Sequence, residues 1–298
     1  MTLKTWFYEV RPQFLLLDPC VASLGLALAL YDGFFDFFHM VLSLLGVIFL
    51  HISVNVLNDY FDYKSGIDLH TRRTPFSGGS GMLPPRILNA KSVYWFGVFS
   101  SMPAFFIAFY FLAVYGWLLI PIILVAIIST YFYTTHFAKW MAGELLAGLN
   151  LGSLVVLGTY FTQTGFYGVK ALVACVSPGI LVCNLLLLNE FPDVEADLIG
   201  KRLNIPIIFG RRTAAKIYSA LVALNYLSII VPAVFGTLPI TSLFALATVP
   251  FALKAVGLAL KHHDDVEKLL PALKFNVLTV LLTPAFASIG ILIATYGL

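Results

Sequence analysis

Residues 37–68 read FFHMVLSLLGVIFLHISVNVLNDYFDYKSGID, a long apolar run that ends in amides and carboxylates. A helix needs about 20 mostly apolar residues to cross the hydrocarbon core of a bilayer, and residues 37–60 supply them. The stretch therefore predicts a membrane-spanning helix with a polar cluster at its end.

The rest of the chain has the same character. Of its 298 residues 60% are hydrophobic and 11% are charged, whereas a soluble domain carries about 25% charged residues. A chain of this composition cannot cover itself with polar surface, so we expect the lipid bilayer to surround it. The net charge of +3 gives no reason to expect nucleic acid as a partner.

The apolar segments predict one all-α integral membrane domain over residues 1–298, with about nine transmembrane helices. We place them near residues 12–30, 37–60, 92–114, 117–135, 142–162, 170–190, 214–236, 238–260 and 271–296. The sixth span, like the second, ends in an acidic cluster followed by a basic loop, which suggests a weak relation between two halves. The first span lacks a small-residue cleavage site, so we expect a retained anchor.

Basic residues predict the orientation. The N-terminus and the connections after spans two, four, six and eight, with adjoining helix ends, hold 17 of the 18 Lys and Arg, and Lys170 lies on the other side. By the positive-inside rule, the N-terminus and the long loops 61–91 and 191–213 face the cytoplasm, and the C-terminus lies outside. We therefore expect a multi-pass protein of the cell membrane.

The first polar cluster places oxygen ligands on one helical face. Asn55, Asn58, Asp59 and Asp62 are spaced i, i+3, i+4 and i+7, which stacks them over two turns. His51, one turn earlier, is expected to face the helix bundle, and we assign it no ligand role. The cluster continues to Asp68.

The second cluster repeats the pattern after the sixth span, with Asn189, Asp193 and Asp197 at i, i+4 and i+8. Carboxylates near a bilayer are costly and repel one another, and a hard divalent cation removes that repulsion. Mg²⁺ takes oxygen ligands, typically one or two carboxylates with waters and substrate phosphates. Two facing clusters predict two Mg²⁺ ions that hold a diphosphate. The alternative, solvated helix ends, does not account for two such clusters beside basic loops.

Basic residues in both long loops suit a diphosphate. Arg72 precedes the glycine-rich stretch 77–81, and Lys201 follows the second cluster. Arg binds phosphate through a bidentate fork and Lys as a point charge. The glycines would cradle phosphate or act as a lid hinge. Topology and contact with anionic lipid remain the alternative for each basic residue.

A third polar patch follows the fourth span. Tyr133 offers an aromatic face that can stabilise an allylic carbocation, and Lys139 can reach a phosphate. An interfacial aromatic belt explains Tyr131 and Phe132 equally well and remains open for Tyr133.

With these motifs the sequence resembles the UbiA superfamily of intramembrane prenyltransferases over nearly its whole length. The resemblance implies a ring of nine helices around a central cavity with a cytoplasmic loop cap. It also implies roles for individual residues. Mg²⁺–diphosphate would be held by Asn58, Asp62, Asp193 and Asp197; the diphosphate would be gripped by Arg72, Lys139 and Lys201; catalysis would involve Asp59, Asp68 and Tyr133.

One departure from the family pattern bears on the acceptor. Many members, including the 4-hydroxybenzoate branch, carry an acid where this chain has Gly66, and here the acid appears at Asp68. The stretch 58–68 looks more like the branch that makes menaquinone through 1,4-dihydroxy-2-naphthoate.

The resulting hypothesis is Mg²⁺-dependent transfer of a polyprenyl group from a donor such as geranylgeranyl diphosphate to a small aromatic or polar acceptor, most simply a quinone precursor. A glycerol-phosphate acceptor of ether-lipid synthesis is an alternative with the same chemistry. A cation-coupled transporter is a more distant one, although such carriers bind their ions near the bilayer midplane.

Overall fold

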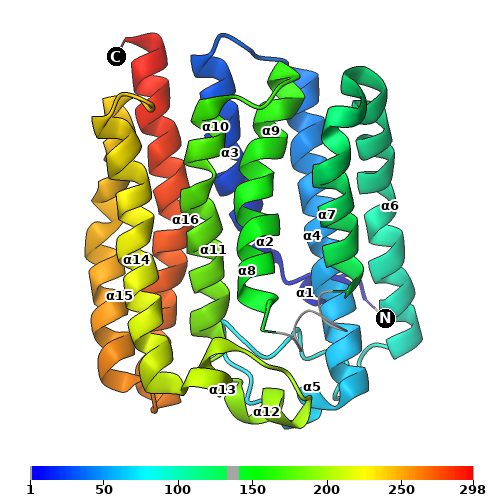
Figure 1. The fold of residues 1–298 in the computed structure, drawn as a ribbon. Helices are drawn as coiled ribbons and strands as arrows, with labels where there is room; N and C mark the ends of the chain where they lie inside the picture. The colour runs from blue at the N-terminus through cyan, green and yellow to red at the C-terminus, as the bar shows by residue number, and fades with distance from the viewer. Residues whose placement is uncertain (1, 133–140, 298) are drawn as a thin grey trace.

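The structure is a computed structural model that describes residues 2–132 and 141–297, and within these ranges its regular elements are all helical. The long helices stand side by side in one bundle (Figure 1). They are α3 (Leu17–Tyr31), α4 (Phe37–Ser65), α6 (Ala90–Tyr115), α7 (Ile120–Phe132), α9 (Leu154–Thr164), α11 (Val176–Asn189), α14 (Arg211–Val234), α15 (Val249–His262) and α16 (Val266–Tyr296).

Shorter elements complete the chain. They are α1 (Leu3–Glu9), α2 (Pro12–Leu15), α5 (Ile67–His70), α8 (Gly143–Ala147), α10 (Val169–Ala174), α12 (Val194–Ile199) and α13 (Ile205–Phe209), with 3₁₀ turns at Gly116–Leu119 and Ile240–Thr248 and a π-helical segment at Gly148–Ser153. The elements α5, α12 and α13 lie across the lower end of the bundle, and the C-terminus lies at the upper end (Figure 1).

Eight helical segments of the described residues are long and apolar enough to cross a membrane. One of them, Ala90–Phe132, is 43 residues long and reverses direction at Gly116, whose φ of +74° favours glycine. Its two arms, α6 and α7, run side by side in Figure 1 and correspond to the predicted spans 92–114 and 117–135. The expectation of an all-helical membrane fold with about nine spans is therefore confirmed.

Small residues let the central helices approach closely. A Cβ atom on Gly25 of α3 would overlap the Val156 carbonyl of α9, and one on Gly290 of α16 would overlap the Thr241 carbonyl. Because lipid tails are as apolar as Leu, packing of this kind rather than the hydrophobic effect holds membrane helices together. The core built by α3, α9, α11 and α16 is thus the rigid frame that positions the site.

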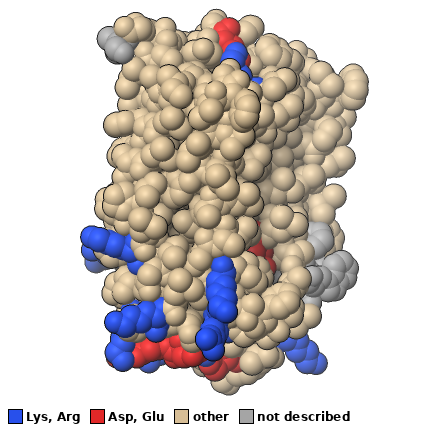
Figure 2. All heavy atoms as spheres, turned by 60° about the vertical axis from the view of Figure 1, so that its left-hand side comes forward, with Lys and Arg blue, Asp and Glu red and all other residues tan. Residues whose placement is uncertain are grey.

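The helix ends at the lower side of the bundle are fixed by local sequence. Gly66, at φ +84°, ends α4 in the left-handed conformation that glycine adopts without strain. The chain then turns directly into α5. On the face that Figure 2 shows, most Lys and Arg side chains gather at this lower end, as the charge pattern of the loops predicts.

Candidate active site

A cavity of about 420 Å³ runs through the middle of the bundle. Its upper part lies between Ser43, Phe111 and Thr162, and its walls are mainly Leu, Ile, Val and Ala from α4, α6, α7, α9 and α11. At the lower end the lining becomes charged, and that part of the wall consists of Arg11, Asp62, Asp68, Glu190, Asp193, Asp197 and Arg202. This is the shape of a site for a ligand with a long apolar tail and an anionic head.

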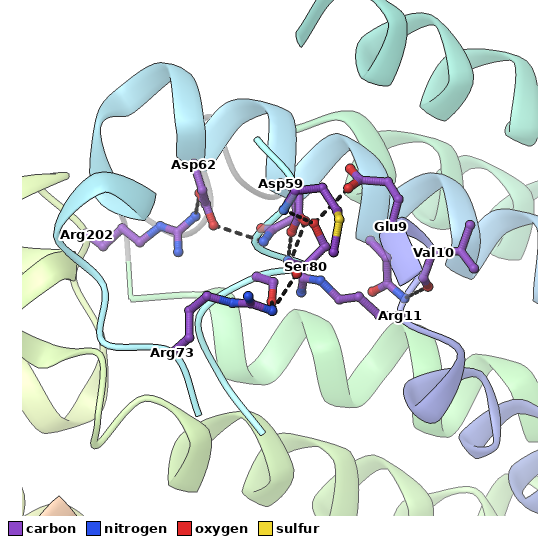
Figure 3. A network of polar contacts seen from close by, with 12 residues as sticks. Glu9, Val10, Arg11, Asp59, Asp62, Arg73, Ser80 and Arg202 are labelled. Atoms are coloured by element: carbon purple, nitrogen blue, oxygen red, sulfur yellow. Dashed lines mark hydrogen bonds and ion pairs between the residues drawn. The ribbon is translucent and has the colours of Figure 1, made fainter. Parts of the chain in front are cut away.

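Of the four helical members of the first cluster, Asn55, Asn58 and Asp62 line the cavity. The Asn58 amide donates a hydrogen bond of 2.9 Å to Asp62 Oδ2. Asp59 points away from them; it is 1% exposed, accepts a 2.7 Å hydrogen bond from the Ser80 N–H and forms an ion pair with Arg11 (Figure 3). The predicted shared face thus holds for Asn55, Asn58 and Asp62, while Asp59 binds the neighbouring loop instead.

The glycine-rich stretch forms part of the cavity wall. Gly78 and Gly79 line the cavity with φ near +85° and +69°. A Cβ at Gly79 would lie 3.2–3.3 Å from carboxylate oxygens of Asp59 and Asp68 and from Arg11 Nη2. The absence of a side chain there keeps the wall thin where charged groups converge. Ser80 connects the stretch to the N-terminus through a 2.7 Å hydrogen bond to Glu9 (Figure 3).

The second cluster faces the first across the charged end. Asp197, on α12, accepts a 3.0 Å hydrogen bond from the Asn204 amide. Asp193 lies just before α12 and also lines the cavity. Buried oxygens without a hydrogen-bond partner among the described residues are found on three neighbours: Asn189 Oδ1, Glu190 Oε2 and Asp193 Oδ1. Unpaired buried oxygens are costly, so their convergence indicates a place for a cation or a donor.

Arg202 connects the two clusters. Its guanidinium forms an ion pair with Asp62 (Figure 3). It also lies 3.4 Å from Asp197 Oδ1, so one cation bridges α4 and α12. From the sequence we assigned the diphosphate to Lys201, the residue before Arg202. The structure brings Arg202 into the cavity wall instead.

Burial dominates the electrostatics of this end. It raises the pKa of Asp68 to about 7, with the charge of Asp62 as a further cause, and the pKa of Asp193 to about 7, with Asp197 adding to it. Burial also raises the pKa of Asp197 to about 6, against the lowering effect of Arg202. Around neutral pH these carboxyls therefore gain a counter-cation or retain protons.

A further buried acid adjoins the second cluster. Burial and the neighbouring Glu144 raise the pKa of Glu190 well above its ordinary value. Glu144 is 2% exposed and accepts a 2.8 Å hydrogen bond from the Ile205 N–H, which holds α13 in place. The two acids are 46 positions apart along the chain, and only the fold shows that they meet.

Other predicted residues lie elsewhere. Arg72 is exposed and its Nη2 lies 2.7 Å from Glu267 of α16, and Lys201 is exposed at φ +56°. Neither lines the cavity. Tyr133 and Lys139 fall in residues 133–140, outside the described residues. Diphosphate contacts for Arg72 and Lys201 stay predictions.

The sequence analysis did not predict that Arg11 belongs to the site. It precedes Pro12 at the start of the first span, at φ +54°, and its buried side chain lines the cavity. Burial lowers its pKa, while the carboxylates of Asp68 and Asp62 oppose that change. The available signal was a lone Arg next to an apolar run, which the positive-inside rule explains equally well.

The donor set fits magnesium that arrives with a substrate phosphate. In the described residues no group of three His, Cys, Asp or Glu side chains is close enough to form a ready-made metal site. Arg202 occupies the space between Asp62 and Asp197. Mg²⁺ needs only one or two protein carboxylates when phosphates and waters fill the rest, and the unpartnered oxygens of Asn189 and Asp193 add neutral and anionic donors.

Comparisons with known proteins agree with this geometry. The model of the UbiA prenyltransferase family matches residues 19–291. A 1,4-dihydroxy-2-naphthoate octaprenyltransferase of Bacillus subtilis is 27% identical over 96% of this chain and 91% of its own. A UbiA homologue from Archaeoglobus fulgidus, solved with GPP and Mg²⁺, superposes with a TM-score of 0.59 at 15% identity, covering 96% of this chain and 99% of that one.

A structure of digeranylgeranylglyceryl phosphate synthase gives a TM-score of 0.61 at 19% identity, with 97% of this chain and 98% of that chain covered. At such identities the two solved structures establish a shared fold. The family model covers most of the chain and supplies the assignment. The chain belongs to the UbiA prenyltransferase family and is a prenyltransferase.

Proposed function

We propose that this protein transfers a polyprenyl group from a prenyl diphosphate to a hydroxylated aromatic acceptor of the naphthoate type, with Mg²⁺, and releases diphosphate. The observation that carries the proposal is the cavity itself, in which two acidic clusters face each other at one end of a long apolar channel. Support for the acceptor comes from the naphthoate octaprenyltransferase, which aligns over nearly the whole chain.

The head group would be held at the charged end. Asn58, Asp62, Asp193 and Asp197 would hold the magnesium ions, two by our expectation, and Arg202 and Arg11 lie beside them to contact diphosphate oxygens. When bound, the metal neutralises the leaving group and orients it. The glycines at 78 and 79 line this end of the cavity, where a phosphate would lie against the backbone.

The tail would occupy the channel. From Asp62 to Ser43 the helix α4 rises about 28 Å at 1.5 Å per residue, so the channel suits a long isoprenoid. Burial of each CH₂ group contributes about 0.8 kcal/mol of binding free energy. Donors such as geranylgeranyl diphosphate fit this description, and the chain length is set by the upper wall around Phe111.

The reaction breaks the bond between the prenyl C1 and the diphosphate oxygen and forms a carbon–carbon bond to the acceptor ring. Asp68 lines the charged end with a pKa near neutrality and is our candidate for taking up the released proton. Asp59 supports the site by holding Arg11 and Ser80. Tyr133 retains its predicted role beside the carbocation.

We further propose that the charged end faces the cytoplasm, with the N-terminus inside and the C-terminus outside. The bias of Lys and Arg supports this orientation. A glycerol-phosphate acceptor has less support, because it would need cations beyond those that bind the diphosphate. Among the described residues the cations lining the cavity are Arg11 and Arg202, and both are already paired with carboxylates.

The test uses purified protein in detergent with geranylgeranyl diphosphate and a panel of acceptors that includes 1,4-dihydroxy-2-naphthoate and glycerol phosphate. We expect diphosphate release that requires Mg²⁺, stops with EDTA and is coupled to a prenylated naphthoate product. Transfer to glycerol phosphate and not to the naphthoate would mean that the acceptor is a glycerol phosphate rather than an aromatic compound. Absence of both transfer and donor binding would contradict the proposal.

A further inference from the structure

A buried His–Asp pair lies in the wall of the channel, away from the acidic clusters. His51 of α4 and Asp18 of α3 approach to 2.7 Å between Nδ1 and Oδ1, and their side chains are 4% and 0% exposed. A buried ionisable pair inside a membrane span is energetically costly, so its presence points to a function. A buried carboxylate next to an imidazole is the arrangement that orients a catalytic histidine.

The orientation of the pair leaves one ring nitrogen for the channel. Nδ1 of His51 is hydrogen-bonded to Asp18, so Nε2 is the ring nitrogen that could bind a ligand. Within residues 2–132 and 141–297 no hydrogen bond is made to Nε2. His51 lines the cavity, whereas Asp18 does not. A carboxylate that accepts from Nδ1–H fixes the tautomer in which Nε2 is a hydrogen-bond acceptor.

The depth of His51 matches the place where chemistry must occur. It lies seven residues before Asn58 on the same face of α4, about 10 Å further up the channel. Above it the walls are mainly apolar and suited to the tail, and below it lie the charged groups suited to the diphosphate. A hydrocarbon tail offers an imidazole no hydrogen-bond partner, so a polar group at this depth points to a second, polar substrate.

Asn150 supplies a second polar group that lines the cavity. Its Oδ1 is buried without a hydrogen-bond partner among the described residues, and it belongs to the π-helical segment Gly148–Ser153. Such segments recur at functional sites. An acceptor ring with more than one polar substituent would find partners on both α4 and this segment.

We propose that His51, oriented by Asp18, binds the hydroxyl group of the aromatic acceptor and takes up its proton. This inference rests on the proposed function. The O–H bond of the acceptor breaks and its proton passes to Nε2; the ring carbon of the resulting phenoxide then attacks C1 of the prenyl chain. Diphosphate leaves with the electron pair of the C1–O bond.

The attacked carbon next releases the group that it carried. This group leaves as a proton to the charged end or, where the carbon bore a carboxylate, as CO₂. The aromatic phenoxide that remains takes the proton back from the imidazolium. His51 thus ends in its starting state and Asp18 acts as a positioning residue throughout.

The experiment measures prenyl transfer by His51→Gln, His51→Ala and Asp18→Asn with geranylgeranyl diphosphate and 1,4-dihydroxy-2-naphthoate. We expect both His51 variants to lose at least about 10²-fold in kcat, the usual contribution of a general base. Their affinity for the donor, measured by isothermal titration in the presence of Mg²⁺, should stay near that of the unmodified protein. Asp18→Asn should lose less than His51→Ala.

Ser53→Ala is the matched control. Ser53 is buried on the same helix, but it donates a 2.8 Å hydrogen bond to the Gly97 carbonyl of α6 and does not line the cavity. This variant should transfer prenyl groups at nearly the original rate. If His51→Gln lost donor binding and thermal stability together, the pair would be a structural link between α3 and α4, and the proposal would be overturned.

An acceptor with a methylated hydroxyl tests whether His51 recognises that hydroxyl or only packs in the cavity wall. Replacing the acceptor hydroxyl with a methoxy group should abolish transfer by the unmodified protein, because a site built for a hydroxyl rejects an analogue without it. The residual activity of His51→Ala should discriminate far less between the two acceptors. Unchanged activity and unchanged discrimination in His51→Gln would sink the inference while leaving the proposed function intact, since the unmodified protein tests the latter directly.

Discussion

The two acidic clusters look alike in sequence but differ in the structure. In the first, Asp59 and Asp62 already have cationic partners in Arg11 and Arg202. In the second, Asp197 shares Arg202, but Asp193 and the adjoining Glu190 keep buried oxygens that accept no hydrogen bond from the described residues. The difference indicates that the protein itself supplies the positive charge that neutralises the first cluster. The second cluster depends more on the cation that arrives with the substrate.

The largest effect that follows from this comparison is expected at Asp193. Changing Asp193→Asn should lower prenyl transfer by about 10³-fold, because a lost metal contact costs several kcal/mol in the transition state and each 1.36 kcal/mol is tenfold. The rate is measured as diphosphate release at saturating Mg²⁺.

Glu195→Gln is the control for Asp193. Glu195 belongs to the same cluster but pairs with Arg211, and its side chain is 71% exposed. Its activity should remain near normal. Full activity in Asp193→Asn would mean that the second cluster holds no metal.

Arg202 tests the first cluster. Changing Arg202→Met removes the partner of a buried carboxylate, which typically costs about 3–5 kcal/mol of stability. The melting temperature in EDTA should fall, and Mg²⁺ with diphosphate should restore part of the loss by supplying another cation. A more exposed carboxylate offers a comparison: Glu195→Gln should change the melting temperature little, because the Glu195 side chain is well solvated.

The pH dependence sharpens the contrast. Folding raises the pKa of Asp193 to about 7 from 3.8, so between these values the folded protein binds more protons than the unfolded chain. Stability of the metal-free protein should therefore fall as pH rises from 4 toward 7. Since Mg²⁺ binds the deprotonated carboxyls, it should raise the melting temperature more at pH 8 than at pH 6. An equal rise at both values would contradict the shifted pKa.

The smallest effect is expected at Arg72. Its ion pair with Glu267 is 71% and 73% exposed, and exposed pairs contribute about 0–1 kcal/mol. Arg72→Gln should therefore change the rate by less than about threefold, since 0.6 kcal/mol corresponds to about that factor. A loss of tenfold or more would support the sequence-based assignment and imply that the loop turns inward on binding substrate.

The sequence predicted much of the fold because lipid imposes simple rules. Apolar length located the spans, including the two arms of Ala90–Phe132, which join at Gly116 without a polar loop. Periodicity also placed Asn58 and Asp62 on one face. These features depend on neighbours along the chain.

Partners distant along the chain were not predictable in this way. Arg11 reaches Asp59 across 48 positions and His51 reaches Asp18 across 33, and no local pattern encodes either contact. Each of these side chains has an ordinary local explanation, either topology or bundle packing. Only the assembled helices show that Arg11 and His51 line one cavity.

The Arg202 bridge has a consequence for how the site empties. Because the Arg202 guanidinium is part of the chain, its effective concentration beside Asp62 and Asp197 is high. Metal binding therefore exchanges one positive charge for another and does not fill an anionic site without a cation. Such an exchange weakens the apparent affinity for free divalent ions. It also assists the departure of metal and diphosphate together, so the enzyme is less easily trapped by its own product.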